Sequence, residues 1–236
     1  MLRYVFCACA LVLMVPFFGQ AQDRLRDDSD WWSVLRRDPS SPVVKPRDVA
    51  IPESNFELSG VVLGPKQFEQ LATKFGKTEE IERGDASTGR NQVCYRSAAA
   101  GEPIHLVFEF GEVDEIFYLF SGGANWSGSE SCAKSKLIDQ QLSTKSGLKL
   151  GLSRTQVEAI LGPADMASGD RIYYSRVTKR KTTPEEFERM RKQYPEKLTD
   201  EQAHEEFDYF DLTVYIEVRF ERSKLVYLVV DRSETD

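Results

Sequence analysis

The chain has 236 residues, a formal net charge of −7 and a pI near 5.1, with 41% hydrophobic and 29% charged residues. This composition is typical of a soluble globular protein with one large or two small domains, and it excludes disordered, collagen-like and multi-span membrane chains. The acidic balance argues against nucleic acid as a partner, because phosphate binding needs a clustered positive field. The sequence holds only two histidines, His105 and His204, so we expect no histidine-rich metal site and no cofactor.

Residues 1–21 have the pattern of a secretory signal peptide. Arg3 supplies a positive charge, Tyr4 to Phe18 form an apolar run, and Gly19 and Ala21 are small residues at the cleavage positions. A retained membrane anchor is the alternative, but a span needs roughly 20 apolar residues and this run is shorter. We therefore expect cleavage after Ala21 and a periplasmic or extracellular location, with membrane contact only through an uncleaved signal.

The number and positions of the cysteines are consistent with an exported protein. Cys7 and Cys9 lie inside the predicted signal, which leaves Cys94 and Cys132 in the mature chain. An even number of cysteines in an exported protein predicts a disulfide between them, and two buried free thiols are the alternative. The sequence has no Cys-x-x-Cys spacing that would indicate a catalytic redox pair.

Residues 22–57 have the composition of an N-terminal tether. Four prolines occur between residues 39 and 52, and proline prevents regular helices and strand ladders. The adjacent Trp31 and Trp32 either fold back into a groove on the domain or form a docking peptide for a partner.

An internal repeat follows, with a first copy at 58–132 and a second at 133–236. The copies open with Gly60–Gly64 and Gly147–Gly151, and each opening leads into a predicted amphipathic helix that ends at a glycine. The matched apolar residues are Leu71 and Phe75 before Gly76, and Val157 and Leu161 before Gly162. Each glycine stands where a left-handed residue is expected to end the helix.

Each copy then continues with a strand and a hairpin. The predicted strands of the first copy are 92–97, 104–110 and 116–120, and those of the second are 171–176, 212–220 and 225–230. Alternation predicts that Glu109 and Arg219 face outward. The predicted fold is therefore α+β, made of two tandem units in which one helix packs on antiparallel strands.

Two segments interrupt the repeat. Residues 121–131 are rich in glycine and serine, and the isolated Trp126 there either tucks inward or belongs to a binding loop. Residues 177–211 form a charged insertion with two helix-start patterns, at Thr183–Glu186 and Thr199–Gln202. We expect a two-helix excursion that is either a solvated hairpin or a partner-docking arm.

Catalytic motifs were sought and are absent from the sequence. It contains no Gly-x-Ser-x-Gly, His-Glu-x-x-His, P-loop or dinucleotide-binding pattern. The acids Glu109, Glu112, Asp114 and Glu115 cluster at one turn. They leave a carboxylate hydrolase open as the alternative to a protein without catalytic residues.

The stretch Ser146–Pro163, which reads SGLKLGLSRTQVEAILGP, resembles the helical signature of BamE-type (SmpA/OmlA) outer-membrane assembly lipoproteins and of β-lactamase-inhibitor-protein-like repeats. The resemblance implies a non-enzymatic α+β domain that binds another protein in the cell envelope. It carries over no functional residue, because the shared glycines and apolar residues determine the fold. Two features differ from the BamE type: this sequence has no suitable lipid-attachment cysteine, and it has two units.

These observations predict an exported module that binds a protein or cell-envelope component through its sheet face and the Trp126 loop. The candidate anchors are the aromatic residues Trp31, Trp32, Tyr95 and Trp126, since aromatic residues dominate many interfaces. A purely structural envelope component is a further alternative. The sequence does not indicate the oligomeric state.

Overall fold

The computed structural model describes residues 43–63, 67–83, 89–98, 104–111, 114–121, 132–193 and 199–235. The predicted signal peptide, Trp31, Trp32 and Trp126 lie outside the described residues. No helix among the described residues is long and apolar enough to cross a membrane.

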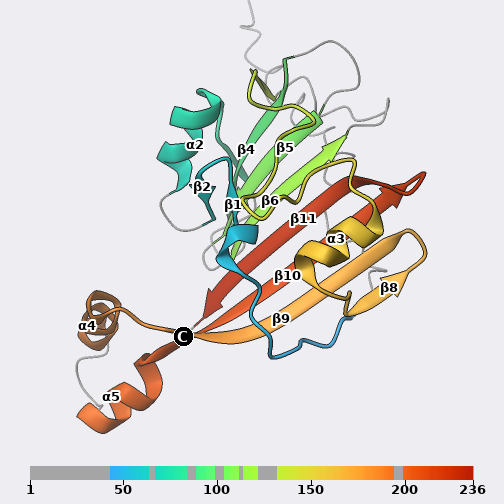
Figure 1. The fold of residues 1–236 in the computed structure, drawn as a ribbon. Coiled ribbons are helices and arrows are strands. Elements are labelled where there is room, and N and C mark those ends of the chain that lie inside the picture. The colour runs from blue at the N-terminus through green and yellow to red at the C-terminus, as the bar shows by residue number, and fades with distance from the viewer. Residues whose placement is uncertain are drawn as a thin grey trace, which may run out of the picture.

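The fold is α+β, with helices on a mostly antiparallel sheet (Figure 1). Its first part comprises the 3-10 helix η1 (Glu53–Asn55), β1 (Glu57–Leu58), β2 (Val61–Val62), α2 (Gln67–Phe75), β3 (Ile81–Arg83), β4 (Arg90–Ser97), β5 (Ile104–Phe110), β6 (Asp114–Ser121) and β7 (Ala133–Ser135). The second part comprises α3 (Arg154–Leu161), β8 (Met166–Ser168), β9 (Arg171–Lys181), α4 (Pro184–Gln193), α5 (Asp200–Phe207), β10 (Tyr209–Glu221) and β11 (Lys224–Thr235).

One sheet of nine strands runs through both parts of the chain. Its order is β3-β4-β5-β6-β11-β10-β9-β8, and β7 adds to β4 as a parallel neighbour. The two parts meet at the antiparallel pair of β6 and β11, where Phe120 lies opposite Tyr227. In each part a helix is followed by a three-residue strand and then by three long strands.

The two faces of this sheet differ in what covers them. We call the face that packs against α2, α3 and the β1–β2 hairpin the helix face. Its buried side chains include Leu106, Phe108, Leu119, Val214, Ile216, Val218, Leu228 and Val230. We call the other side the opposite face. Among the described residues no helix lies over it (Figure 1), but its side chains form a second buried cluster, which includes Val107, Tyr118, Phe120, Tyr227 and Val229.

Local sequence explains where α3 begins and where α2 and α3 end. In α3, Ser153 accepts a hydrogen bond from the Gln156 N–H, and the Gln156 side chain accepts one from the Ser153 N–H. The helices end before Gly76 (φ +102°) and Gly162 (φ +83°), so the predicted left-handed glycines are confirmed.

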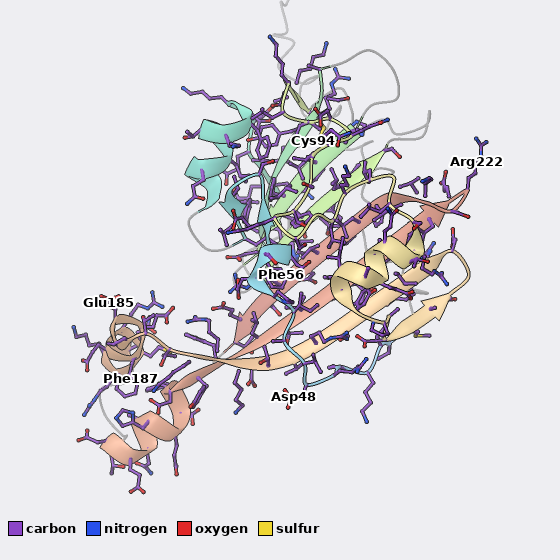
Figure 2. The ribbon with its side chains drawn as sticks, in the orientation of Figure 1. Asp48, Phe56, Cys94, Glu185, Phe187 and Arg222 are labelled. Carbon is purple, nitrogen blue, oxygen red and sulfur yellow. A yellow bond between two sulfur atoms is a disulfide. The ribbon has the colours of Figure 1, made fainter. Side chains whose placement is uncertain are left out.

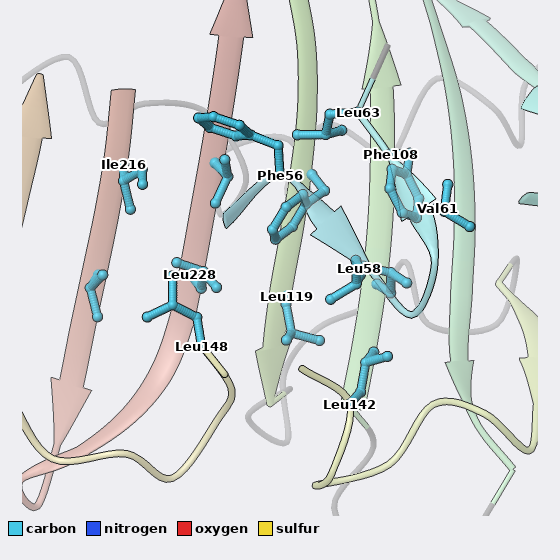
Figure 3. Close-up of a cluster of buried hydrophobic side chains, with 14 of the residues drawn as sticks. Phe56, Leu58, Val61, Leu63, Phe108, Leu119, Leu142, Leu148, Ile216 and Leu228 are labelled. Carbon is cyan, nitrogen blue, oxygen red and sulfur yellow. The ribbon is translucent and has the colours of Figure 1, made fainter. Parts of the chain in front are cut away.

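The segment before α2 is part of the core. Phe56, Leu58, Val61 and Leu63 are at most 3% exposed and pack against the helix face of the sheet (Figure 3). The predicted tether extended to residue 57, but Ile51 and Phe56 are buried. Proline spacing indicated an irregular backbone correctly, and irregular backbone still buries the apolar side chains that it carries.

The chain begins its described course along the edge of β9. Arg47 donates its N–H to the Ser175 carbonyl at 3.0 Å and accepts from the Val177 N–H at 3.1 Å. Its guanidinium contacts Asp165 at 3.0 Å, and Asp165 also pairs with the buried Arg176. This segment therefore lies as a short parallel neighbour of β9 beyond the end of β8.

The predicted two-helix excursion is confirmed, with shorter bounds. Strand β9 continues to Lys181 and β10 starts at Tyr209, so the flanks of the predicted insertion belong to the sheet. Helices α4 and α5 project away from the body, as Phe187 and Glu185 show in Figure 2. They share a small core of their own, made of Met190, Ala203 and Phe207 with Phe187 and Phe210 packed against it.

Candidate functional site

The opposite face of the sheet is the candidate functional site. Strand alternation places on it one side chain from every second position of β4, β5, β6, β11, β10 and β9. Its members include Arg90, Gln92, Cys94, Arg96, His105, Val107, Glu109, Ile116, Tyr118, Phe120, Arg171, Tyr173, Ser175, Tyr215, Glu217, Arg219, Tyr227, Val229 and Asp231. Five aromatic side chains and four arginines make this face different from the aliphatic helix face.

A buried carboxylate stands in the first half of this face. Glu109 on β5 is 3% exposed, and it accepts hydrogen bonds from Arg90 at 2.6 Å and Gln92 at 2.9 Å, both on β4. The expectation that Glu109 points away from the helices is met, but its carboxylate is not solvated. The neighbouring strand compensates the charge, since a buried carboxylate needs a paired cation.

A second buried carboxylate stands in the other half. Glu217 on β10 is 1% exposed and accepts a hydrogen bond from Arg219 at 2.5 Å, while Arg171 on β9 lies 3.7 Å away. Strands β5 and β10 are three strands apart in the sheet, which places the Cα atoms of the two glutamates at least about 14 Å from each other. Each half of the face therefore has its own carboxylate–arginine pair.

Aromatic rings fill the space between these pairs. Phe120 stacks on His105 with ring centroids 5.1 Å apart and contacts Tyr227 at 6.0 Å. The Arg219 guanidinium lies over the Tyr227 ring at 4.2 Å, which joins the aromatic cluster to the Glu217 pair. Burial raises the pKa of the Tyr118 and Tyr227 hydroxyls, so both stay neutral at physiological pH.

The predicted disulfide lies on the same face. Cys94 on β4 is bonded to Cys132, with Cα atoms 4.7 Å apart, and both residues are buried. It ties the start of β7 to β4.

The aromatic anchors expected from the sequence are placed only in part. Tyr95 points to the helix face, is 1% exposed and packs on the Phe75 ring with centroids 5.4 Å apart. Burial raises the pKa of its hydroxyl to about 12. Tyr95 is therefore a core residue and not an accessible anchor, because odd-numbered positions of β4 face the helices. Trp31, Trp32 and Trp126 lie outside the described residues.

The acids that suggested a hydrolase do not converge where they are described. Glu109 lies on the opposite face, whereas Glu115 lies on the helix face beside Arg232, its partner in register. Burial raises the pKa of Glu115 to about 7, Arg232 lowers it in part and Glu234 adds to the rise. Glu112 and the side chain of Asp114 lie outside the described residues.

The two histidines have separate surroundings. His105 is fully buried, and burial together with Arg96 lowers its pKa to about 4, so its ring is neutral at physiological pH. His204 is exposed on α5, where its Nδ1 lies 2.8 Å from Asp208. Within the described part of the chain, no three histidine, cysteine, aspartate or glutamate side chains come together as a possible metal site.

No local sequence signal marks Arg90, Arg171, Tyr215 or Arg219 as site residues. Each is a single polar or aromatic residue in a strand with an ordinary alternation of apolar and polar residues. The pairing register of the strands would have been needed to find them, because only that register brings Arg171 next to Glu217.

Comparisons with known proteins found no matching family model, no similar curated sequence and no similar solved structure.

Proposed function

We propose that this protein is an exported module without catalytic activity, which binds a protein or another cell-envelope component through the opposite face of its sheet. The observation that carries the proposal is the difference between the two faces. The described helices pack on one face. The other face has a buried aromatic cluster, and the partly exposed groups around it are Tyr215 and arginine side chains, residue types enriched at the energetic centres of protein interfaces.

The charge pairs support binding rather than chemistry. Glu109 and Glu217 are each paired with arginine and stand on strands three positions apart in the sheet, whereas the paired carboxylates of glycosidases face each other at roughly 5–10 Å. The side chains of Arg90, Arg171 and Arg219 are 21–35% exposed, so part of each reaches the surface of this face. Partly exposed arginine fixed in one geometry is a low-entropy contact for a partner.

We further propose that the fold arose from a tandem duplication, with units at 58–132 and 133–236. Supporting it are the shared order of helix, short strand and three long strands, and the central antiparallel pairing of β6 with β11. The proposal is consistent with the resemblance of Ser146–Pro163 to BamE-type and inhibitor-type repeats.

Export is the remaining part of the proposal and is supported by the sequence of residues 1–21. Amino-terminal sequencing of the protein recovered from the periplasm or medium should begin near Gln22. Recovery of the intact chain from the cytoplasm would contradict it.

Binding is tested by affinity capture from the native envelope or culture fraction with three matched variants. On the opposite face, Tyr215→Lys adds a positive charge and Arg171→Glu reverses one. The control variant, Thr155→Lys, adds a positive charge at an exposed position on α3. Each of the two face variants should capture at least tenfold less of the partner than the wild type does. The Thr155→Lys control should capture the same amount as the wild type. Unfolding midpoints of all three variants establish that each is folded.

Two results would contradict this assignment. Equal capture by the face variants and the control would exclude the opposite face as the interface. The absence of any specific partner would favour the purely structural alternative.

A further inference from the structure

A groove of 440 Å³ lies away from the aromatic centre of the opposite face, where the ends of β5 and β6 meet the loop before α3 and the β10–β11 turn. Five apolar side chains contribute to its walls: Ile104, Leu150, Leu152, Leu225 and Val226. Its polar side chains are Ser121, Gln140, Gln141, Lys149, Gln156 and Lys224. No aspartate or glutamate is among the described residues that line it, although the whole chain carries a net charge of −7.

The polar groups of this groove are mainly donors. Gln141 uses its Oε1 to accept a hydrogen bond from Lys149 Nζ at 2.8 Å, and Gln156 uses its Oε1 to accept from the Ser153 N–H at 2.9 Å. The amide NH₂ group of each glutamine therefore retains donor capacity. Lys149 and Lys224 add two ammonium groups, which have donors and no acceptor.

The walls are fixed by the backbone. The Gly151 N–H donates to the Leu225 carbonyl at 2.8 Å, and the Leu225 N–H donates to the Leu152 carbonyl at 2.8 Å. The Gln141 N–H is held by the Asp139 carboxylate at 2.7 Å. The loop that carries Lys149 is thus joined to β11, whose first residue is Lys224, so the backbone of the groove is held in place on both sides.

We propose that this groove binds a peptide carboxylate, either a carboxyl terminus or a glutamate or aspartate side chain. A carboxylate has only acceptors, which matches a donor-rich lining that holds no acid. The apolar walls favour a carboxylate attached to an apolar peptide over a free inorganic anion, because burying those walls adds to the affinity.

Titration calorimetry with the purified chain tests this with four probes: acetyl-Ala-Ala-Leu with a free carboxyl terminus, the same peptide amidated, amidated acetyl-Ala-Glu-Leu, and inorganic phosphate. At least one carboxylate peptide should bind at least tenfold more tightly than the amidated neutral peptide and phosphate. The two carboxylate peptides distinguish a terminal from a side-chain source.

The double variant Lys149→Gln/Lys224→Gln should weaken this binding at least tenfold, and Lys224→Gln alone, on an exposed turn, should weaken it measurably. The control Lys145→Gln, whose ammonium pairs with Glu57, should leave it unchanged. Equal binding of the amidated neutral peptide, phosphate binding as tight as that of the peptides, or the same loss in the control would each overturn the proposal. So would the absence of peptide binding at millimolar concentration.

Discussion

The acidic side chains of the sheet are compensated to different degrees. Glu109 and Glu217 each accept hydrogen bonds from arginine within 2.6 Å. Glu115 lies beside Arg232, but Arg232 is itself bonded to the Leu63 carbonyl and to Glu234. Burial therefore outweighs the attraction at Glu115 and raises its pKa to about 7.

This gives a pH dependence of stability with a defined sign. The folded state holds the Glu115 proton up to about pH 7, whereas the unfolded chain releases it near pH 4.5. Stability must therefore fall as the pH rises from 4.5 to 7. Glu115→Gln should remove this loss and be more stable than the wild type by about 1–2 kcal/mol at pH 8, a value reduced for partial exposure.

Urea unfolding of both proteins at pH 4.5 and pH 8 measures the effect of Glu115→Gln. The difference between the two proteins should be smaller at pH 4.5. The same difference at both pH values would show that Glu115 titrates normally.

The Cys94–Cys132 disulfide spans 38 residues. Closing a loop of this size restricts the unfolded chain, so Cys94→Ser/Cys132→Ser should lower the free energy of unfolding by about 3–4 kcal/mol. Urea midpoints with and without dithiothreitol measure it. The reduced wild type should approach the double variant, and an unchanged midpoint on reduction would be evidence against a stabilising role.

At the scale of elements, the segment before α2 closes the core between the helices. Phe56 is fully buried and lies 5.6 Å from the Arg232 guanidinium. Phe56→Ala should cost about 3–5 kcal/mol, because it leaves a cavity in the centre of the helix layer. The control is Val49→Ala in the same segment, where the side chain is 51% exposed and the expected change is within about 0.5 kcal/mol.

The α4–α5 arm is a separable element. The Thr182 N–H donates to the Asp208 carbonyl at 2.9 Å, so the ends of the excursion are neighbours. Replacing residues 183–207 with Asn-Gly should close β9 and β10 as a two-residue hairpin. The main thermal transition should move by no more than the equivalent of about 1 kcal/mol, mostly from loss of the partly exposed Arg180–Glu186 pair.

Circular dichroism follows the loss of helix in the arm deletion. Phe187→Ala, which loosens only the core of the arm, serves as a control and should leave the same main transition. A large fall in the melting temperature of the deletion would instead show that the arm supports the sheet.

At the scale of the molecule, the two halves share one core. The buried cluster of the helix face runs from Phe75 on α2 to Val157 on α3 without interruption. Leu119→Ala on β6 and Leu228→Ala on β11 should therefore each lower one common unfolding transition, by about 2–5 kcal/mol. Calorimetry that separates two transitions in either variant would contradict a single cooperative unit.

The sequence predicted most elements because their signals are local. The alternation of β5, β10 and β11, the cap at Ser153, the glycines that end α2 and α3 and the two-helix excursion are all readable within short windows. The burial of Ile51 and Phe56 was missed because proline spacing describes the backbone and not where a side chain packs. The assignment of Tyr95 failed for a related reason, since its face depends on the register of β4 within the whole sheet.

The candidate face shows the same limit. Glu109 was expected to face outward and does lie on the side away from the helices, but no local signal indicated that its carboxylate is buried. Only the pairing of β4 with β5 supplies the guanidinium that makes its burial tolerable. Cross-strand partners far apart in sequence carry the chemistry of this face, and a single sequence does not display them.

Both edges of the sheet are formed by short strands or segments. On one side β3 and β7 share the outer rim of β4, and on the other β8 and the Arg47 segment share that of β9. A long unpaired rim would be a template on which another molecule could add its own strand, and from there a fibre could grow. Three-residue pieces offer too few consecutive donors and acceptors for such growth. The protein thus presents a broad sheet to its surroundings while remaining closed to polymerisation through its rims.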